Sequence, residues 1–358
     1  MKNKKPGTIE YERKPENKID KCQSPRDLTF LTEEQIFGDK AKGINQLDIF
    51  AKVGTKAAIT DFSILSGGYV SDNYHIDSDK SLKGRTGYSW SSTRDGGTHA
   101  RCVDSGGTSG WHDRDDRNVS ARSASLSSGG SPSIIPPNAV RGQDGVLRFK
   151  EGEYPQTAAG ADVSAQLDAA LKNGTLKTTG KAYTTDSHRW NEIYESFTPL
   201  THTEYEYAGK KYIQVKANLY NENVSLSNGG HVKTGEAIWV EVEPITWLYD
   251  EKTGIMVTEK LIFAGVQFNE QPYDGDFSKT TIKNFMDTYV AKEIRTDYGQ
   301  DAEGPHKQML FAEKPYEDEY PNPLQVMKYF LWCENFKYDP NSVNAITHYI
   351  TKYQAKEL

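Results

Sequence analysis

Residues 87–130 contain too few apolar side chains to build a hydrophobic core of their own. Ser, Gly, Asp and Arg dominate the segment, yet anchoring residues recur among them at Trp90, Cys102, Val103, Trp111 and Leu126. Short alternating runs at 88–90 and 100–103 are separated by Gly pairs, which is typical of strands joined by turns. The segment therefore predicts a small antiparallel meander, with Trp90, Val103 and Leu126 as scaffold residues and the polar side chains displayed.

The displayed side chains form a predicted contact face for a ligand. Aromatic and Arg side chains offer large, rigid contacts, and Ser, Asn and Asp beside them supply adaptable hydrogen bonds. Trp111 has two possible roles, because a Trp in a polar loop either fills a core or stands exposed as a contact residue. The predicted contact residues are Thr93, Arg94, Asp95, Thr98, His99, Arg101, Asp104, Ser105, Thr108, Ser109, Trp111, His112, Asp113, Arg114, Asp115, Arg117 and Asn118.

Catalytic and metal chemistry find little support in the sequence. The His residues fall in no recognised catalytic spacing, and His99 and His112 beside Cys102 are more simply explained as solvated loop residues. Asp113, Asp115 and Asp116 could bind a hard cation, but interleaved Arg side chains would neutralise such a site. We expect no catalytic residue, no metal and no cofactor; a metal-dependent or thiol-dependent enzyme is the alternative that titration of Cys102 would test.

Composition limits the classes of partner. The 358 residues are 36% hydrophobic and 11% aromatic, so aromatic side chains must carry much of the packing. A formal net charge of -7 argues against a general nucleic-acid-binding protein, which needs a basic face. Three well-separated cysteines suggest neither a disulfide framework nor a zinc site. No apolar run predicts a signal peptide or a membrane helix, so we expect no membrane insertion and a location in the cytoplasm before release or on a virion.

Changes in composition along the chain predict three regions. Residues 1–26 are Lys-rich and polar, which is typical of an extended arm that orders against a partner. The Ser-, Gly- and Pro-rich stretch 127–138 is the clearest linker. We therefore predict a module at 27–135, which displays segment 87–126, and a second α+β module at 136–358.

Local patterns predict several elements. The sequence indicates a helix start capped by Thr32, followed by buried positions at Ile44, Leu47, Ile49 and Phe50. Residues 57–65 fit either a helix or a strand. Other expected elements are a tight turn at 151–156 that enters a strand, a helix at 161–174, a hairpin at 204–217 turning at Ala208-Gly209, a strand at 237–249 that Pro244 bends or ends, a helix over 282–289 capped by Ser278 or Thr280, and helices near 326–333 and 343–353.

Several motifs resemble a known family. GYSWSST, ARCVDSGG and SARSASL are similar to the C-terminal half of C-type-lectin-fold proteins related to formylglycine-generating enzymes. GEYPQT, WVEVEPITWLYD, LIFAGVQFN and TTIKNFMDTYV resemble the first half of the same family in bacteria and phages. The resemblance implies an α+β fold of C-type-lectin-like modules with small antiparallel sheets and flanking helices. The halves stand in swapped order, which leaves one permuted domain or two modules open, and residues 120–124 lack the family's usual Pro.

The resemblance also implies a function. The enzymes' catalytic cysteine pair has no counterpart, so catalysis is not carried over, and the nearest likeness is to variable proteins diversified by retroelements. Residues 93–120 are rich in the residue types that such rewriting produces. We therefore expect a non-enzymatic receptor-binding protein on a phage particle, which contacts a cell-surface protein or glycan and attaches to its carrier, or to copies of itself, through the arm and the C-terminal helices. The alternative is a structural virion or assembly protein whose module only packs against neighbours.

Overall fold

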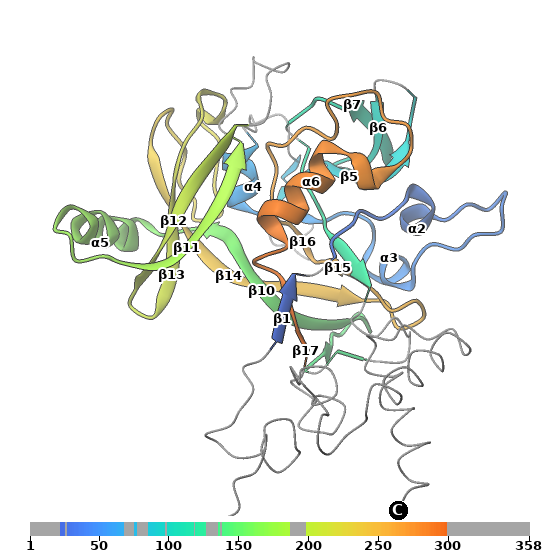
Figure 1. Cartoon of the computed structure of the whole chain (residues 1–358), viewed down its shortest axis with the longest axis horizontal. Helices are drawn as coiled ribbons and strands as arrows, with labels where there is room; N and C mark the ends of the chain where they lie inside the picture. Colours follow the sequence, from blue (N-terminus) through green and yellow to red (C-terminus); the bar gives the residue numbers. More distant parts are fainter. Residues whose placement is uncertain are drawn as a thin grey trace, which may run out of the picture.

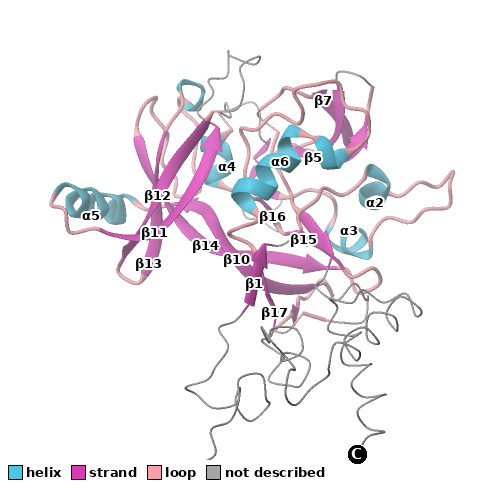
Figure 2. Ribbon diagram, viewed as in Figure 1, coloured by secondary structure: helices cyan, strands magenta, loops and turns pink. Residues whose placement is uncertain are grey.

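Sheets dominate the architecture, and the helices are few and mostly short (Figure 2). The structure is a computed structural model that describes residues 22–25, 27–67, 75–76, 85–96, 99–117, 119–126, 135–136, 138–186 and 198–298. The fold is therefore a mixed α+β fold built mostly from antiparallel sheets. The helices predicted near 326–333 and 343–353, and most of the predicted arm, lie outside the described residues.

The largest sheet has eight strands, all paired antiparallel. Six of them follow the order β11-β12-β13-β14-β10-β9, while β15 pairs with β14, and β8 pairs with β15. Their bounds are β8 (Ala124–Leu126), β9 (Val140–Arg141), β10 (Leu147–Ala158), β11 (Lys177–Asp186), β12 (Pro199–Tyr207), β13 (Lys210–Lys216), β14 (Ala237–Tyr249) and β15 (Ile255–Thr258). The long strands β10 and β14 cross the middle of the molecule and connect its two sides (Figure 1).

Strand β14 spans the predicted range, but Pro244 neither ends nor interrupts it. Pro244 lies opposite Glu153 at the point where the β10–β14 register shifts. The bulge is on β10, where Gly152 adopts a positive φ of 71°. Residues 151–156 are therefore part of a long bulged strand, and the prediction of a tight turn there was wrong.

Three smaller sheets complete the strand content of the described residues. A four-stranded sheet has the order β16-β2-β4-β3, in which β16 and β2 run parallel. A two-stranded sheet pairs β1 with β17, and a three-stranded sheet has the order β5-β6-β7. Their bounds are β1 (Cys22–Pro25), β2 (Ala58–Ile59), β3 (His75–Ile76), β4 (Arg85–Thr86), β5 (Ser89–Arg94), β6 (His99–Val103), β7 (Ser109–Asp113), β16 (Lys260–Leu261) and β17 (Arg295–Tyr298).

Two of the helices begin at hydrogen-bonding Thr caps that the sequence predicts. Thr32 caps α2 through a capping box with Gln35, as predicted, and the Thr280 hydroxyl accepts from Lys283 N (3.2 Å) at the start of α6. Residues 57–65 contain both a strand and a helix start. The helices are α2 (Glu33–Phe37), α3 (Asp48–Val53), α4 (Asp61–Ser66), α5 (Ala161–Lys172) and α6 (Thr281–Phe285), with a π-helical turn η5 (Met286–Val290) and 3-10 turns η3 (Leu219–Asn221) and η4 (Phe277–Lys279).

Two further local predictions have different outcomes. Leu47, Ile49 and Phe50 are buried as expected, but the Ile44 side chain is 37% exposed, so its predicted burial was wrong. The α5 helix is confirmed and packs Leu167 against Trp239, whose Nε1 donates to Asp168 Oδ1 (2.8 Å). In the ranges that the structure describes, no helix has the length and apolar character needed to cross a membrane.

One hydrophobic core joins residues from both sides of the predicted linker. Phe62 and Trp90, before residues 127–138, belong to the same buried cluster as Trp247 and Phe268, after them. The Trp90 and Phe268 ring centroids are 5.2 Å apart. Strands also pair across this stretch, β8 with β15 and β2 with β16. The linker therefore does not divide the described residues into two separate cores.

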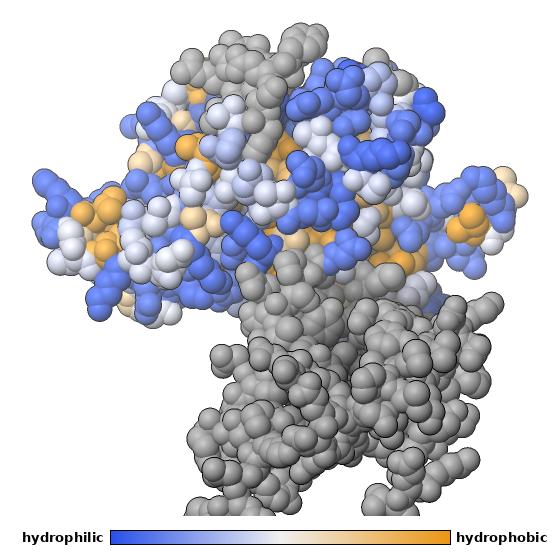
Figure 3. All heavy atoms as spheres, viewed as in Figure 1, coloured by the Kyte–Doolittle hydropathy of each residue, from blue (hydrophilic) through white to orange (hydrophobic). Residues whose placement is uncertain are grey.

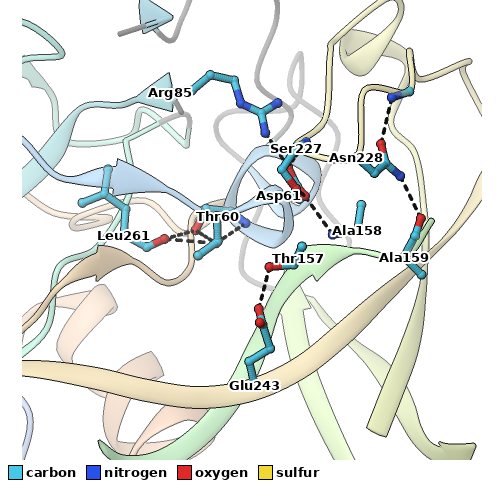
Figure 4. A network of polar contacts seen from close by, with 12 residues as sticks. Thr60, Asp61, Arg85, Thr157, Ala158, Ala159, Ser227, Asn228, Glu243 and Leu261 are labelled. Atoms are coloured by element: carbon cyan, nitrogen blue, oxygen red, sulfur yellow. Dashed lines mark hydrogen bonds and ion pairs between the residues drawn. The ribbon is translucent and has the colours of Figure 1, made fainter. Parts of the chain in front are cut away.

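A buried carboxylate fixes α4 against the large sheet (Figure 4). Asp61 Oδ1 accepts from Arg85 Nη2 (2.6 Å) and Ser227 N (2.9 Å), and Asp61 Oδ2 accepts from Ala158 N (2.8 Å) and the Ser227 hydroxyl. The side chain of Asp61 is 1% exposed. This carboxylate thus ties β4, β10 and the loop before β14 to the start of α4.

Candidate functional site

The predicted meander is the three-stranded sheet β5-β6-β7. Its turns lie at Gly96 and at Gly106-Gly107, where the composition predicted them. Arg101 pairs with Trp111 and His99 with Asp113, so these side chains project from the same side of the sheet. Ala100 pairs with His112 on the opposite side. Strand alternation therefore divides the segment into an inner face and an outer face.

The inner face anchors the meander to the core. Ala100 and Cys102 are buried on β6, and the scaffold residue Trp90, opposite Cys102, is 2% exposed. The scaffold residue Val103 is 4% exposed and lies on the other side of β6, where it packs against residues of α2 and α3. Leu126 lies in β8, and its side chain is outside the described residues. These contacts confirm Trp90 and Val103 as scaffold residues.

His112 also lies on the inner face, although it was predicted as a contact residue. Its ring centroid is 4.6 Å from that of Tyr88, and its Nδ1 lies 2.7 Å from Asp116 Oδ2. The side chain is half-buried. The ring and Nδ1 of His112 thus both contact other residues of the protein, and its role as a contact residue stays a prediction.

The outer face centres on Trp111, whose side chain is 55% exposed. The Trp111 ring packs edge-on against His99, with the two ring centroids 4.3 Å apart. His99 in turn lies 3.2 Å from Asp113 through Nε2 and Oδ1. Of the two roles predicted for Trp111, filling a core was therefore wrong and exposure is correct.

Arg101 is held beside Trp111 by two carboxylates. Its Nη2 lies 3.0 Å from Asp95 Oδ1, and its Nε lies 3.6 Å from Glu33 Oε2. Glu33 also accepts from the Ser109 hydroxyl, and its backbone N donates to Thr93 Oγ1 (2.8 Å). Because Glu33 is on α2, far away in sequence, no local pattern could have assigned it to this face. We define the outer face as Asp95, His99, Arg101, Ser109, Trp111 and Asp113 together with Glu33.

Hydrophilic side chains cover most of the surface over β5–β7 in the view of Figure 3. Arg94 and Thr108 are exposed at the sheet's margins, where they extend the polar surface. Arg114 and Asp115 are half-buried in the turn after β7, and the Arg114 backbone O accepts from Asn269 N (3.1 Å). The outer face is thus one Trp surrounded by ion-paired and hydroxyl side chains.

Two of the predicted contact residues help to build the β6–β7 turn, and their contact with a ligand stays a prediction. Asp104 Oδ1 accepts from Thr108 N (2.8 Å), while the backbone O of Ser105 accepts from Thr86 Oγ1 (2.8 Å). A further hydrogen bond joins Thr55 Oγ1 to Gly107 O (2.6 Å). The turn is therefore fastened to β4 and to the residues after α3.

Arg117 is not a contact residue. It is 4% exposed, forms an ion pair with Asp186 at the end of β11, and lies within 3.3 Å of Gln267 Oε1 through Nη2. Its burial reflects a structural role, since an Arg this deep needs a carboxylate to offset its desolvation. Thr98 and Asn118 lie outside the described residues.

The thiol of Cys102 on this sheet is buried. Burial raises the pKa of the Cys102 thiol to about 12, with Asp104 adding to the shift. A buried thiol with so high a pKa is a poor nucleophile at neutral pH. Within the described ranges, no three or more His, Cys, Asp or Glu side chains are grouped so that they could hold a metal ion.

Comparison of the chain with protein-family models, with curated proteins and with solved structures finds no match in any of the three.

Proposed function

We propose that this chain is a non-enzymatic binding protein whose outer face contacts a cell-surface protein or glycan. The exposure of Trp111 carries the proposal. A large aromatic ring that is 55% exposed loses the stabilisation that burial would give, unless contact with a partner later covers it. Trp and Arg are also the side chains that most often dominate binding energy at interfaces.

The surroundings of Trp111 support recognition because they are held in place before any partner arrives. His99 packs against the indole, and Arg101 is fixed by Asp95 and Glu33. Contacts that are already ordered lose less conformational entropy on binding. The face offers a partner an aromatic platform, a guanidinium, a hydroxyl and carboxylates within a few strand positions.

The proposal also includes a more specific class of protein, which the sequence motifs suggest. In this proposal the chain is a C-type-lectin-like variable protein, diversified by a retroelement and displayed on a phage particle. The division of the meander into an anchored inner face and a polar outer face is what such a protein requires, because substitutions on the outer face leave the core intact. Several copies on one carrier would convert weak single contacts into avidity.

Sequencing many copies of this gene from one population tests the proposal. We expect substitutions at the outward positions His99, Arg101, Ser109, Trp111 and Asp113. The inward positions Trp90, Ala100, Cys102, Gly110 and His112 should remain constant. An alternating pattern along β6 and β7 supports diversification, whereas uniform constancy supports the structural virion or assembly protein.

Binding itself is tested with substitutions that leave the core untouched. Trp111→Ala should reduce binding to whole bacterial cells and to a printed glycan array by at least about tenfold, as expected for a central aromatic contact. Leu219→Ala is the matched control, because Leu219 is 52% exposed in the 3-10 turn η3. Equal binding by the wild type and both variants would contradict the assignment of the outer face.

A further inference from the structure

A small cavity lies between the meander and the helices α2 and α3. Its volume is about 10 Å³, which accommodates one water-sized particle. Most of its wall is apolar. The lining residues are Leu31, Ile36, Phe50, Thr55, Ser89, Trp90, Val103, Arg122 and Val257.

Arg122 brings a positive charge to this apolar cavity. Its side chain is 7% exposed, Nε donates to Thr258 O (2.7 Å), and Nη1 lies 3.5 Å from Thr55 O. The guanidinium carbon lies 5.1 Å from the Phe50 ring centroid. Within the described ranges, no carboxylate lies at ion-pair distance from this guanidinium.

Arg122 keeps its positive charge at neutral pH despite its burial. Burial lowers its pKa to about 10, an effect that the more distant Glu259 partly opposes. Arg122 thus stays protonated at neutral pH. Burying a cation without a neighbouring negative charge costs desolvation free energy, and buried cations in proteins usually have an anionic partner.

Trp90 is a second lining residue that carries a polar group. Its indole Nε1 is buried and has no hydrogen-bond acceptor among the residues that the structure describes. Most buried N–H groups in proteins are hydrogen-bonded. A buried indole N–H without a partner, on a residue that lines a cavity, therefore suggests that a further molecule or ion supplies the acceptor. The side chains of Arg122 and Trp90 carry hydrogen-bond donors but no acceptor atoms. This favours an occupant that only accepts hydrogen bonds.

We propose that this cavity binds a small inorganic anion, with chloride as its ordinary occupant. A halide is near the size of a water molecule, accepts hydrogen bonds from every direction, and would neutralise Arg122. A carboxylate or phosphate group is too large for a cavity of this volume. The proposal does not depend on what the outer face binds, because none of the residues that line the cavity belongs to the outer face as defined above.

Thermal unfolding in chloride and in gluconate tests the proposal at constant ionic strength. Sodium chloride replaces sodium gluconate stepwise, so that screening stays fixed while a small anion replaces a large one. We expect a saturable rise in the Tm of the wild type, on the order of 2–4 °C, because a ligand that binds only the folded state stabilises it. Arg122→Met should abolish the rise, whereas Arg94→Met, which removes an exposed arginine of β5, should retain it.

A second measurement on the wild type keeps the proposal testable if Arg122→Met fails to fold. Chlorine NMR of the folded protein should show a broadened chloride line that narrows when excess bromide competes for the site. Equal Tm values in chloride and gluconate, or a line width that bromide leaves unchanged, would overturn the proposal and leave water as the occupant. A rise shared equally by all variants would also overturn it, because it would reflect general anion binding to the surface.

Discussion

At the scale of single residues, we expect Asp61 to contribute strongly to the free energy of unfolding. Four donors converge on its two oxygens, and Arg85 supplies a charge that is itself buried. Asp61→Ala would leave that charge and two backbone N–H groups without this acceptor. We expect a loss of about 3–5 kcal/mol in the free energy of unfolding, measured by urea denaturation.

An exposed ion pair provides the comparison. Lys252 and Asp48 lie 2.8 Å apart, but their side chains are 72% and 37% exposed. Asp48→Ala should therefore cost less than about 1 kcal/mol. A similar loss in both variants would mean that burial does not set the difference between the two pairs.

His202 makes stability depend on pH. Burial lowers its pKa from 6.5, while the backbone carbonyl of Gln214 partly opposes the shift. The folded state therefore binds fewer protons than the unfolded state, so stability is complete above about pH 6.5 and falls as the pH drops toward the folded pKa. His202→Gln should lose less unfolding free energy than the wild type between pH 7.5 and pH 5.5. Equal losses in urea titrations at the two pH values would exclude His202 as the cause.

At the scale of elements, the β12–β13 turn carries avoidable strain. Ala208 and Gly209 have φ angles of 51° and 77°, and this two-residue turn with both φ angles positive favours Asn-Gly. Ala208→Asn should raise the free energy of unfolding by about 0.5–1 kcal/mol, because Asn tolerates the left-handed region better than Ala. Gly209→Ala should lower it, and urea denaturation compares the two. An Ala208→Asn variant less stable than the wild type would contradict this reading of the turn.

The sequence predicts well those helices, strands and turns whose structure depends on residues close together in the chain. The Thr32 cap, the α5 helix, the 204–217 hairpin and strand β14 all follow from residues within a few positions of one another. The first half of strand β10 was missed, and a turn was predicted at 151–156, because the charged residues around the bulge at Gly152 interrupt the alternation. The meander was predictable as strands, whereas the burial of Arg117 depends on Asp186, whose position beside it no local pattern encodes.

At the scale of the whole molecule, distant segments support both the outer face and the cavity. Glu33 on α2 positions Arg101, and Thr55 after α3 fastens the β6–β7 turn. Arg122 contacts the carbonyl of Thr258 at the end of β15. Composition predicted a boundary at residues 127–138, but it could not predict these pairings, because contacts between distant segments leave no periodic signal in either one.

The shared core predicts that the chain survives being cut. A protease site inserted between residues 129 and 130 should yield two pieces that co-elute in size-exclusion chromatography and unfold in one cooperative transition. The reason is that β8 pairs with β15, β2 pairs with β16, and Trp90 packs against Phe268 across the cut. As a control, the same cut in denaturing urea should release two separate pieces. Two species of independent stability under native conditions would mean that each side folds alone, and the linker would then divide two domains as its composition suggests.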